Sequence, residues 1–307
     1  MWKILVTTYF SSITRKINSK GFVVFNADQK KLPSKKYGLP MEIKELYQYP
    51  LKSTRGVTLE TTEILKTGFK HDRCIAVIDK KNRVVTGRER PELLKIRSKI
   101  EMQYLRLSIP ETNEFSFALP HEGEVTEVKL FRNPVLGRVF SAKAANWISN
   151  FLNDDFRLVF IDNAYNLVQE KRGGKVGEYK AYSDSSPIHL INLRTLDCLN
   201  SSLKSAVGVR NFRSNIVVDG MEAFEEDTWS TVEINGCRFR AQERTSRCIF
   251  TTINPETSKK NRNMQPLSEL AQIRLKMGLR PTFGIGLVPL GEGFISLGDE
   301  LKIIAKT

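Results

Sequence analysis

Cysteine and histidine are scarce in this chain of 307 residues. It has four cysteines, at positions 74, 198, 237 and 248, and three histidines that lie far apart in the sequence. The cysteines show neither the Cys-x-x-Cys spacing of zinc fingers nor the framework of a small disulfide-bonded secreted protein. We therefore expect reduced thiols in a compartment that faces the cytosol. Any histidine-based metal site or Cys-His pair would have to be assembled by folding.

Acidic residues and long apolar runs are missing from the amino-terminal region. Residues 1–27 hold no Asp or Glu, but four Lys or Arg and six Ser or Thr. On a helix, these polar residues would lie opposite an apolar stripe made of Trp2, Val6, Phe10, Ile13 and Ile17. This composition is typical of a mitochondrial leader, and the apolar stretch is too short and too interrupted to span a bilayer. We expect residues 1–40 to be a targeting or anchor segment with a linker, able to meet a membrane surface; a frayed terminus is the alternative.

The formal net charge of +14 is unevenly distributed. Residues 1–44 carry nine Lys or Arg against two acidic residues, which is half of the excess. The rest of the chain is only mildly basic and has no basic run interleaved with aromatic residues, as single-strand binders have. We expect no nucleic-acid partner; an anionic cofactor and an acidic protein partner account better for the remaining charge.

From residue 41 onward the sequence alternates short apolar runs with turns. Strands are predicted at residues 74–78, 83–86, 100–109, 124–131, 157–161 and 188–193, helices at 144–154 and 267–277, and a long surface loop at 162–179. Many short strands with regular turn signals indicate a barrel or a sandwich rather than a wound parallel sheet. The predicted fold class is a β-rich α+β fold.

A hairpin signal precedes the last cysteine. The alternating run at residues 230–234 is followed by Asn235-Gly236 and then by a second run at residues 237–241. Asn-Gly is the strongest pair of turn residues for joining two antiparallel strands. Cys248 is therefore predicted to lie in the turn beyond a hairpin, where loops often carry functional residues.

The residues around Cys248 suit an anionic group better than a packed core. Taken alone, a cysteine beside β-branched residues is often a small buried hydrophobe, and that reading is the alternative here. Arg244 and Arg247 place positive charge near the sulfur, which favours the thiolate that binds metals or attacks as a nucleophile. Ser246 and the pair Thr251-Thr252 add hydroxyl donors to the same loop.

The stretch SRCIFTTINPET, from residue 246 to residue 257, resembles the molybdenum-ligand segment of MOSC-domain proteins. Within that group it is most similar to the mitochondrial amidoxime-reducing component family. The resemblance implies that Cys248 supplies the protein sulfur to a molybdenum held by a pyranopterin dithiolene, the cofactor Mo-molybdopterin. Thr245 stands where the family usually has a second cysteine, which argues against a disulfide at this place.

Other family motifs are dispersed along the chain: YPLKSTRG from residue 49, HDR from residue 71, AYSDSSP from residue 181 and NFRSN from residue 211. The implied cofactor contacts are Lys52, Ser53, Arg73, Asp184, Ser185, Ser186, Arg213, Ser246, Arg247 and Cys248. Arg213 would clamp the pterin phosphate, because a guanidinium binds phosphate through two parallel hydrogen bonds. Asp184 is, with Cys248, a candidate catalytic residue that would orient the substrate or relay protons. Without the resemblance, these residues would be read as surface bases and an ordinary turn.

Two more positions follow from the same comparison of motifs. Arg88 ends a Thr-x-Arg motif whose role is left open. Gly286 stands where relatives of this family carry an aromatic residue, so one wall of the pocket is expected to be more open here.

The implied architecture is an amino-terminal MOSC barrel-like domain at residues 41–161, interleaved with a MOSC β-barrel domain at residues 162–307, with the cofactor between them. The implied function is the reduction of N-hydroxylated compounds, such as amidoximes and hydroxylamines. Electrons would come from NADH through cytochrome b5 reductase and cytochrome b5, at the cytosol-facing side of the mitochondrial outer membrane. The alternative is a MOSC module that carries or transfers the cofactor without reductase activity.

Overall fold

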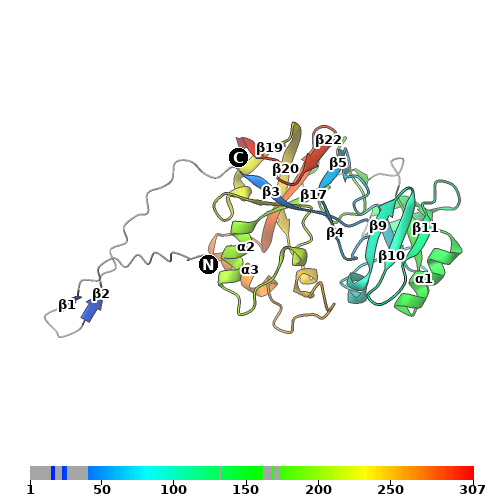
Figure 1. Cartoon of the computed structure of the whole chain (residues 1–307), viewed down its shortest axis with the longest axis horizontal. Helices are drawn as coiled ribbons and strands as arrows, with labels where there is room; N and C mark the ends of the chain where they lie inside the picture. Colours follow the sequence, from blue (N-terminus) through cyan, green and yellow to red (C-terminus); the bar gives the residue numbers. More distant parts are fainter. Residues whose placement is uncertain (1–14, 18–22, 26–40, 131–132, 162–166, 169–172) are drawn as a thin grey trace, which may run out of the picture. The chain divides into compact units, whose positions relative to one another are not determined.

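The computed structural model describes residues 15–17, 23–25, 41–130, 133–161, 167–168 and 173–307 (Figure 1). The chain divides into two compact units, residues 1–38 and 39–307. In the first unit, β1 (Arg15–Ile17) pairs antiparallel with β2 (Val23–Phe25). The predicted helical stripe is therefore wrong at Ile17, where pairing with a β-branched and aromatic run favours a strand. Its other members, and most of the predicted linker, lie outside the described residues.

Eight strands form the main sheet of the second unit, in the order β23-β19-β20-β21-β17-β18-β3-β4. Their bounds are β3 (Glu42–Gln48), β4 (Val57–Leu59), β17 (Ile188–Asn192), β18 (Ile216–Asp219), β19 (Trp229–Ile234), β20 (Cys237–Ser246), β21 (Thr282–Pro289) and β23 (Leu301–Lys306). β17 and β18 run parallel, and every other neighbouring pair in this sheet is antiparallel. The sheet supports one side of the site described below.

Both faces of this sheet are buried along its central strands β17, β18 and β21. Side chains alternate between the faces of a strand, so Val217 packs on one side while Ile216 and Val218 pack on the other. The Val217 side is covered by α2 (Leu193–Ser201) and α3 (Leu267–Lys276), which contribute Leu199 and Leu270 to its core. Figure 1 shows both helices on the same side of the sheet.

The amino-terminal half has its own barrel-like core. Its sheets are β12-β13-β14-β7-β8 and β11-β10-β9. The bounds are β7 (Ile75–Ile78), β8 (Val84–Val85), β9 (Arg97–Glu101), β10 (Tyr104–Ser108), β11 (Phe115–Ala118), β12 (Val125–Leu130), β13 (Asn133–Val139) and β14 (Arg157–Phe160). The helix α1 (Ala142–Leu152) adds its apolar face to this core through Ile148 and Leu152. The predicted β-rich α+β fold is confirmed.

The two halves are interleaved. β3 and β4 belong to the eight-stranded sheet, and β5 (Thr61–Leu65) with β6 (Gly68–Phe69) joins β22 (Gly293–Ser296). In the opposite direction, Ala181 and Tyr182 pack into the amino-terminal core. The division of the chain at residues 161 and 162 stays a prediction, while the sheets show that segments cross between the halves next to the site.

Two local predictions are wrong. The single strand predicted at residues 100–109 is a hairpin of β9 and β10, whose turn places Met102 and Gln103 at φ values of 44° and 68°. Within the predicted loop at residues 162–179, β15 (Leu167–Val168) pairs with β16 (Tyr179–Lys180). Within the described residues, no helix is long and apolar enough to cross a membrane.

Candidate functional site

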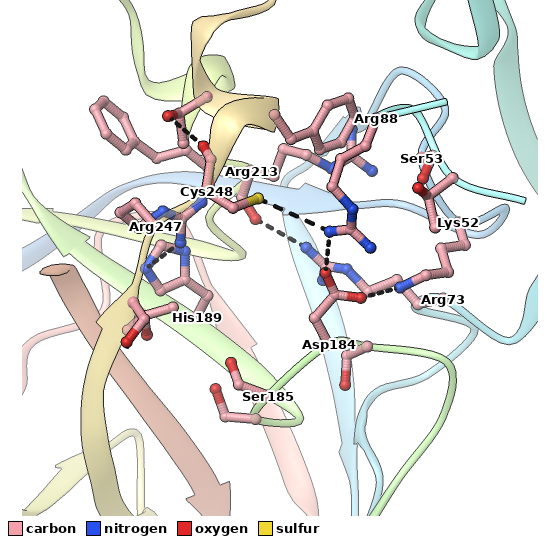
Figure 2. A pocket seen from close by; sticks show the side chains of 18 of the residues that line it. Lys52, Ser53, Arg73, Arg88, Asp184, Ser185, His189, Arg213, Arg247 and Cys248 are labelled. Carbon is pink, nitrogen blue, oxygen red and sulfur yellow. Dashed lines mark hydrogen bonds and ion pairs between the residues drawn. The ribbon is translucent and has the colours of Figure 1, made fainter. Parts of the chain in front are cut away.

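A cavity of about 270 Å³ opens where the two halves meet, and all the predicted cofactor contacts line it (Figure 2). They are Lys52, Ser53, Arg73, Asp184, Ser185, Ser186, Arg213, Ser246, Arg247 and Cys248. These residues come from segments up to about two hundred positions apart, and the interleaved sheets bring them together. Their roles as cofactor contacts stay predictions.

Cys248 reaches the cavity from the end of a hairpin, as predicted. Strands β19 and β20 pair with Ile234 opposite Cys237, and the turn residues Asn235 and Gly236 have φ values of 45° and 77°. Cys248 is the residue before η5 (Ile249–Thr252) and is exposed, unlike the buried Cys237. The alternative reading of a buried core cysteine is therefore wrong for this thiol.

One side of the cavity, the paired wall, consists of Lys52, Arg88 and Asp184. The Lys52 ammonium donates to Asp184 Oδ1 and, at 2.7 Å, to the carbonyl of Tyr182. Arg88 Nη1 donates to Asp184 Oδ2 at 3.0 Å and lies 3.8 Å from the Sγ of Cys248. The two cations thus meet on one carboxylate, and the second of them contacts the thiol.

Ionisation of the paired wall follows from these contacts. Burial alone would raise the pKa of Asp184, but Lys52 and Arg88 more than offset it, so the pKa of this carboxyl lies well below its usual value. Burial lowers the pKa of Lys52, and Asp184 opposes that change. Because Asp184 stays ionised, it has no proton to donate, and it is better suited to orienting a substrate through a hydrogen bond. Its catalytic role stays a prediction.

The other side, the arginine wall, consists of Arg73, Arg213 and Arg247. Arg213 Nη1 donates to the carbonyl of Thr54 at 2.6 Å, and Arg247 Nη2 donates to the carbonyl of Phe212 at 2.6 Å. Burial lowers the pKa of Arg213 and that of Arg247 to about 10, so both remain cations at neutral pH. Their hydrogen-bond partners are neutral, namely two carbonyls and the imidazole of His189, which leaves their positive charge available to an anion.

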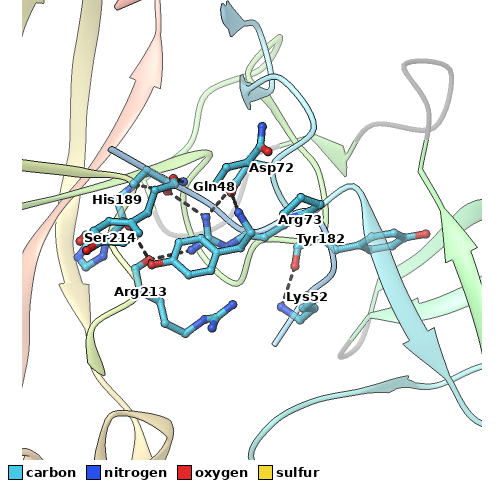
Figure 3. A network of polar contacts seen from close by, with 12 residues as sticks. Gln48, Lys52, Asp72, Arg73, Tyr182, His189, Arg213 and Ser214 are labelled. Carbon is cyan, nitrogen blue, oxygen red and sulfur yellow. Dashed lines mark hydrogen bonds and ion pairs between the residues drawn. The ribbon is translucent and has the colours of Figure 1, made fainter. Parts of the chain in front are cut away.

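Arg73 connects the residues around the arginine wall through an ion pair and hydrogen bonds (Figure 3). It forms an ion pair with Asp72 and donates to Asn215 Oδ1 at 2.9 Å and to the carbonyl of Arg213 at 2.8 Å. The guanidinium groups of Arg73 and Arg213 also lie over the ring of Tyr49, 4.6 and 4.3 Å from its centroid. Stacking and hydrogen bonding together fix the direction of both guanidinium groups.

The donor set of the cavity fits an anionic cofactor. Its lining contains the five cations Lys52, Arg73, Arg88, Arg213 and Arg247 against the single carboxylate of Asp184. Three buried polar atoms of the lining have no hydrogen-bond partner among the described residues: Ser183 Oγ, Thr245 Oγ1 and Arg247 Nε. Buried donors without partners are rare, so these atoms indicate that a polar ligand completes the site.

Cys248 is the candidate metal ligand of the cavity. Among the described residues, no group of three or more His, Cys, Asp and Glu side chains could hold a metal ion. A thiolate is a soft ligand that suits a metal whose other ligands come with a cofactor. The donor set therefore fits a metal carried by an anionic organic group.

Comparisons with known proteins match both halves of the chain. A model of the MOSC N-terminal beta barrel domain matches residues 40–155, and a model of the MOSC domain matches residues 178–302. Mitochondrial amidoxime reducing component 2 of Rattus norvegicus is 33% identical over 245 residues, which cover 76% of this chain and 72% of the relative. The chain belongs to the mitochondrial amidoxime-reducing component family of MOSC-domain proteins.

Another member of this family, mitochondrial amidoxime-reducing component 1 of Danio rerio, is 31% identical over 272 residues, or 84% of this chain and 83% of the relative. Among solved structures, the YUAD protein of Bacillus subtilis matches 86% of this chain and 96% of its own, with a TM-score of 0.40 and 11% identity. The family assignment rests on the sequence matches.

Sequence reasoning missed His189 as a site residue. It lies in the buried strand β17, and its Nε2 is 3.0 Å from the carbonyl of Phe283 and 3.5 Å from Arg247 Nη1. Burial, with Arg247 adding to it, lowers the pKa of His189 well below its usual value, so the imidazole is neutral. A polar residue inside an apolar strand was the signal that could have pointed to it.

The expectation for Gly286 is wrong. Gly286 does not line the cavity; an ideal Cβ at this position would collide with the Oγ of Ser186. The glycine therefore lets β21 approach the turn that carries Ser185 and Ser186, rather than opening a wall of the cavity.

Proposed function

We propose that this protein is a molybdenum-cofactor-dependent reductase of N-hydroxylated compounds, such as amidoximes and hydroxylamines. The observation that carries the proposal is an exposed thiol, Cys248, facing a cavity whose lining has a large excess of positive charge. Membership of the family supports the same activity. The reaction consumes two electrons and two protons, cleaves the N–O bond and releases water with an amidine or an amine.

The arginine wall would hold the phosphate of the cofactor. Among the residues that the structure describes, no carboxylate forms an ion pair with Arg213 or Arg247, and Arg73 fixes the direction of the Arg213 main chain. Guanidinium groups bind phosphate through paired, charge-assisted hydrogen bonds. The unpartnered Thr245 Oγ1 and Arg247 Nε are further donors for it.

Cys248 would supply the protein sulfur ligand. When bound, the molybdenum cofactor supplies the two-electron redox chemistry, and the protein supplies geometry and electrostatics. Asp184, kept ionised by Lys52 and Arg88, would accept a hydrogen bond from the N–H or O–H of the substrate. Ser53, Ser185, Ser186 and Ser246 add hydroxyl groups around the same cavity.

The electron donors in this proposal are cytochrome b5 and NADH-cytochrome b5 reductase, as implied by the family resemblance. The relatives are named as mitochondrial proteins, which supports a mitochondrial location for this chain as well. We place the protein at the outer membrane with its site facing the cytosol, attached through residues 1–40. The basic and acid-free composition of residues 1–27 supports this attachment.

The test is to purify the full chain from a host that makes the cofactor and to measure molybdenum, pterin and benzamidoxime reduction with NADH, the reductase and cytochrome b5. We expect molybdenum and pterin in near-stoichiometric amounts and turnover of the amidoxime. Molybdenum and pterin without turnover would indicate the alternative, a carrier of the cofactor. Protein that contains neither would contradict the proposal.

A further inference from the structure

Arg213 makes fewer hydrogen bonds to the protein than Arg73, its neighbour in the arginine wall. Among the described residues, the Arg213 side chain has one hydrogen-bond acceptor, the carbonyl of Thr54, at 2.6 Å from Nη1. The Arg73 side chain has three partners, Asp72, Asn215 and the carbonyl of Arg213. A single hydrogen bond allows a guanidinium to turn about that bond, so it does not by itself fix the direction of the other N–H groups.

Two aromatic rings supply the missing constraint. The guanidinium of Arg213 lies over the ring of Tyr49, 4.3 Å from its centroid, and over the ring of Phe250, 5.3 Å from its centroid. We propose that Tyr49 and Phe250 are positioning residues that hold Arg213 in the orientation in which it binds a phosphate group. The inference rests on the proposed function, which identifies this group as the phosphate of the cofactor.

Tyr49 is a rigid support for the guanidinium. The residue is 2% exposed, and its hydroxyl donates to the carbonyl of Ser214 at 3.1 Å. Its main-chain N–H donates to Asp72 Oδ1 at 2.8 Å. An ideal Cβ at residue 56 would collide with the ring, so Gly56 lets the main chain pack directly on it. Contacts from three separate segments therefore fix the ring.

Phe250 approaches Arg213 from the segment that follows Cys248. It belongs to η5 and lines the cavity. An ideal Cβ at residue 87 would lie 2.4 Å from an atom of its ring, so Gly87 lets the turn after β8 pack against the ring edge. Like Tyr49, this ring is thus held by a close contact with a glycine.

These contacts restrain the guanidinium without occupying its donors. Cation–π attraction uses the face of a ring and no N–H group, and the five N–H groups of arginine lie in the plane of the guanidinium. Nη1 of Arg213 already donates to Thr54, whereas Nε and Nη2 have no acceptor among the described residues. Nε and Nη2 share one edge of the group, and such an edge matches two oxygens of a phosphate.

The experiment measures the affinity of inorganic phosphate for the full-length protein prepared without cofactor. Isothermal titration calorimetry at constant ionic strength separates phosphate binding from general effects of salt. Tyr49→Leu and Phe250→Leu each remove a ring, whereas Tyr49→Phe and Phe250→Tyr keep it. Arg213→Ala gives the affinity that the other cations of the cavity provide. Circular dichroism verifies that each variant is folded.

Phe156→Leu is the matched control. The ring of Phe156 is buried and lies under the guanidinium of Arg90 at the same centroid distance of 5.3 Å, but neither residue lines the cavity. This variant therefore shows what the loss of a buried, stacked ring does to phosphate binding when Arg213 is not involved.

We expect Tyr49→Leu and Phe250→Leu to weaken phosphate binding about threefold to tenfold, because a long side chain must then be ordered on binding. Tyr49→Phe and Phe250→Tyr should bind phosphate like the unmodified protein, although Tyr49→Phe loses the hydrogen bond to Ser214 and some stability with it. Phe156→Leu should lose stability but not affinity. Phe250→Leu should have no further effect in the Arg213→Ala protein, because the ring acts through that arginine.

Unchanged affinity in Phe250→Leu would overturn the proposal, and this variant decides it even if Tyr49→Leu does not fold, since the Phe250 ring is only partly buried. An equal loss in Phe156→Leu, or the full effect of Phe250→Leu in the Arg213→Ala protein, would overturn it too. So would the absence of phosphate binding in the unmodified protein. The assay uses protein without cofactor, so it decides the role of the rings even if the proposed molybdenum function fails, which metal analysis decides separately.

Discussion

Both walls of the cavity carry cations, but Lys52 and Arg88 differ from Arg213 and Arg247 in what they contact. In the paired wall, Lys52 and Arg88 share the carboxylate of Asp184. In the arginine wall, Arg213 and Arg247 donate to neutral carbonyls. A charge that is already paired contributes mainly to geometry, whereas an unpaired charge in a partly buried site attracts an anion. The difference supports the proposal that the arginine wall would hold the phosphate of the cofactor, while the paired wall would mainly fix the geometry next to Cys248.

The largest effect should come from the thiol beside the paired wall. We expect Cys248→Ser to reduce benzamidoxime turnover to background while the protein keeps its fold and part of its pterin. A hydroxyl is a harder ligand that stays protonated, so the metal loses its protein sulfur while the arginine wall still binds the phosphate. Turnover and pterin content are measured together. Cys198→Ser, which changes a cysteine outside the cavity, should behave like the unmodified protein; parent-rate turnover in Cys248→Ser would refute the ligand assignment.

A substitution in the arginine wall should remove the pterin, unlike Cys248→Ser. Arg213→Ala is expected to lose pterin as well as turnover, with affinity for the phosphate about tenfold to a hundredfold lower, as for the loss of a charge-assisted hydrogen bond. Pterin content after extensive dialysis is the measurement. Arg210→Ala is the matched control, since Arg210 pairs with Glu256 and does not line the cavity. Unchanged pterin content in Arg213→Ala would contradict the proposal that the arginine wall binds the phosphate of the cofactor.

The sequence could predict those features of the site that depend on neighbouring residues in the chain. The hairpin before Cys248 was predictable because Asn235 and Gly236 both favour positive φ, whereas Met102 and Gln103, which occupy the same kind of turn, do not. The residues that the motifs predicted as cofactor contacts all line the cavity, and their roles stay predictions; physics alone would have left Lys52 as a surface lysine.

The remaining features depend on pairing between distant segments. β3 pairs with β18, more than a hundred and fifty positions later, and no local pattern identifies that partner. The contact of Arg88 with Cys248 arises from the same long-range packing. His189 was missed because its strand reads as apolar core, although its neutral imidazole lines the cavity and also contacts Arg247.

A second carboxylate, outside the cavity, has the opposite environment to Asp184. Glu226 is fully buried, and its partners are the uncharged Thr195, at 2.9 Å, and Asn192, at 3.3 Å. Burial raises the pKa of Glu226 from 4.5 to about 7, the reverse of the change at Asp184. A carboxyl whose pKa is raised by folding stabilises the folded protein at pH values below the pKa that it has in the unfolded chain. This stabilisation is lost as the pH rises through the pKa that it has in the folded protein.

We therefore expect Glu226 to reduce the free energy of unfolding by about 3 kcal/mol between pH 4.5 and pH 7. Glu226→Gln should remove this decrease, as measured by denaturant unfolding at a series of pH values. Glu225→Gln is the control, because Glu225 pairs with Lys306 near the surface. If the free energy of unfolding depended on pH in Glu226→Gln as it does in the unmodified protein, the buried carboxyl of Glu226 would not be the cause.

The central claim is that the sulfur of Cys248 binds molybdenum in the cavity between the two walls. X-ray absorption at the molybdenum edge of the purified full-length protein, compared with the Cys248→Ser variant, tests it most directly. The account predicts one sulfur ligand fewer around molybdenum in the variant, with the sulfurs of the cofactor retained. An equal number of sulfur ligands in the two proteins would contradict it.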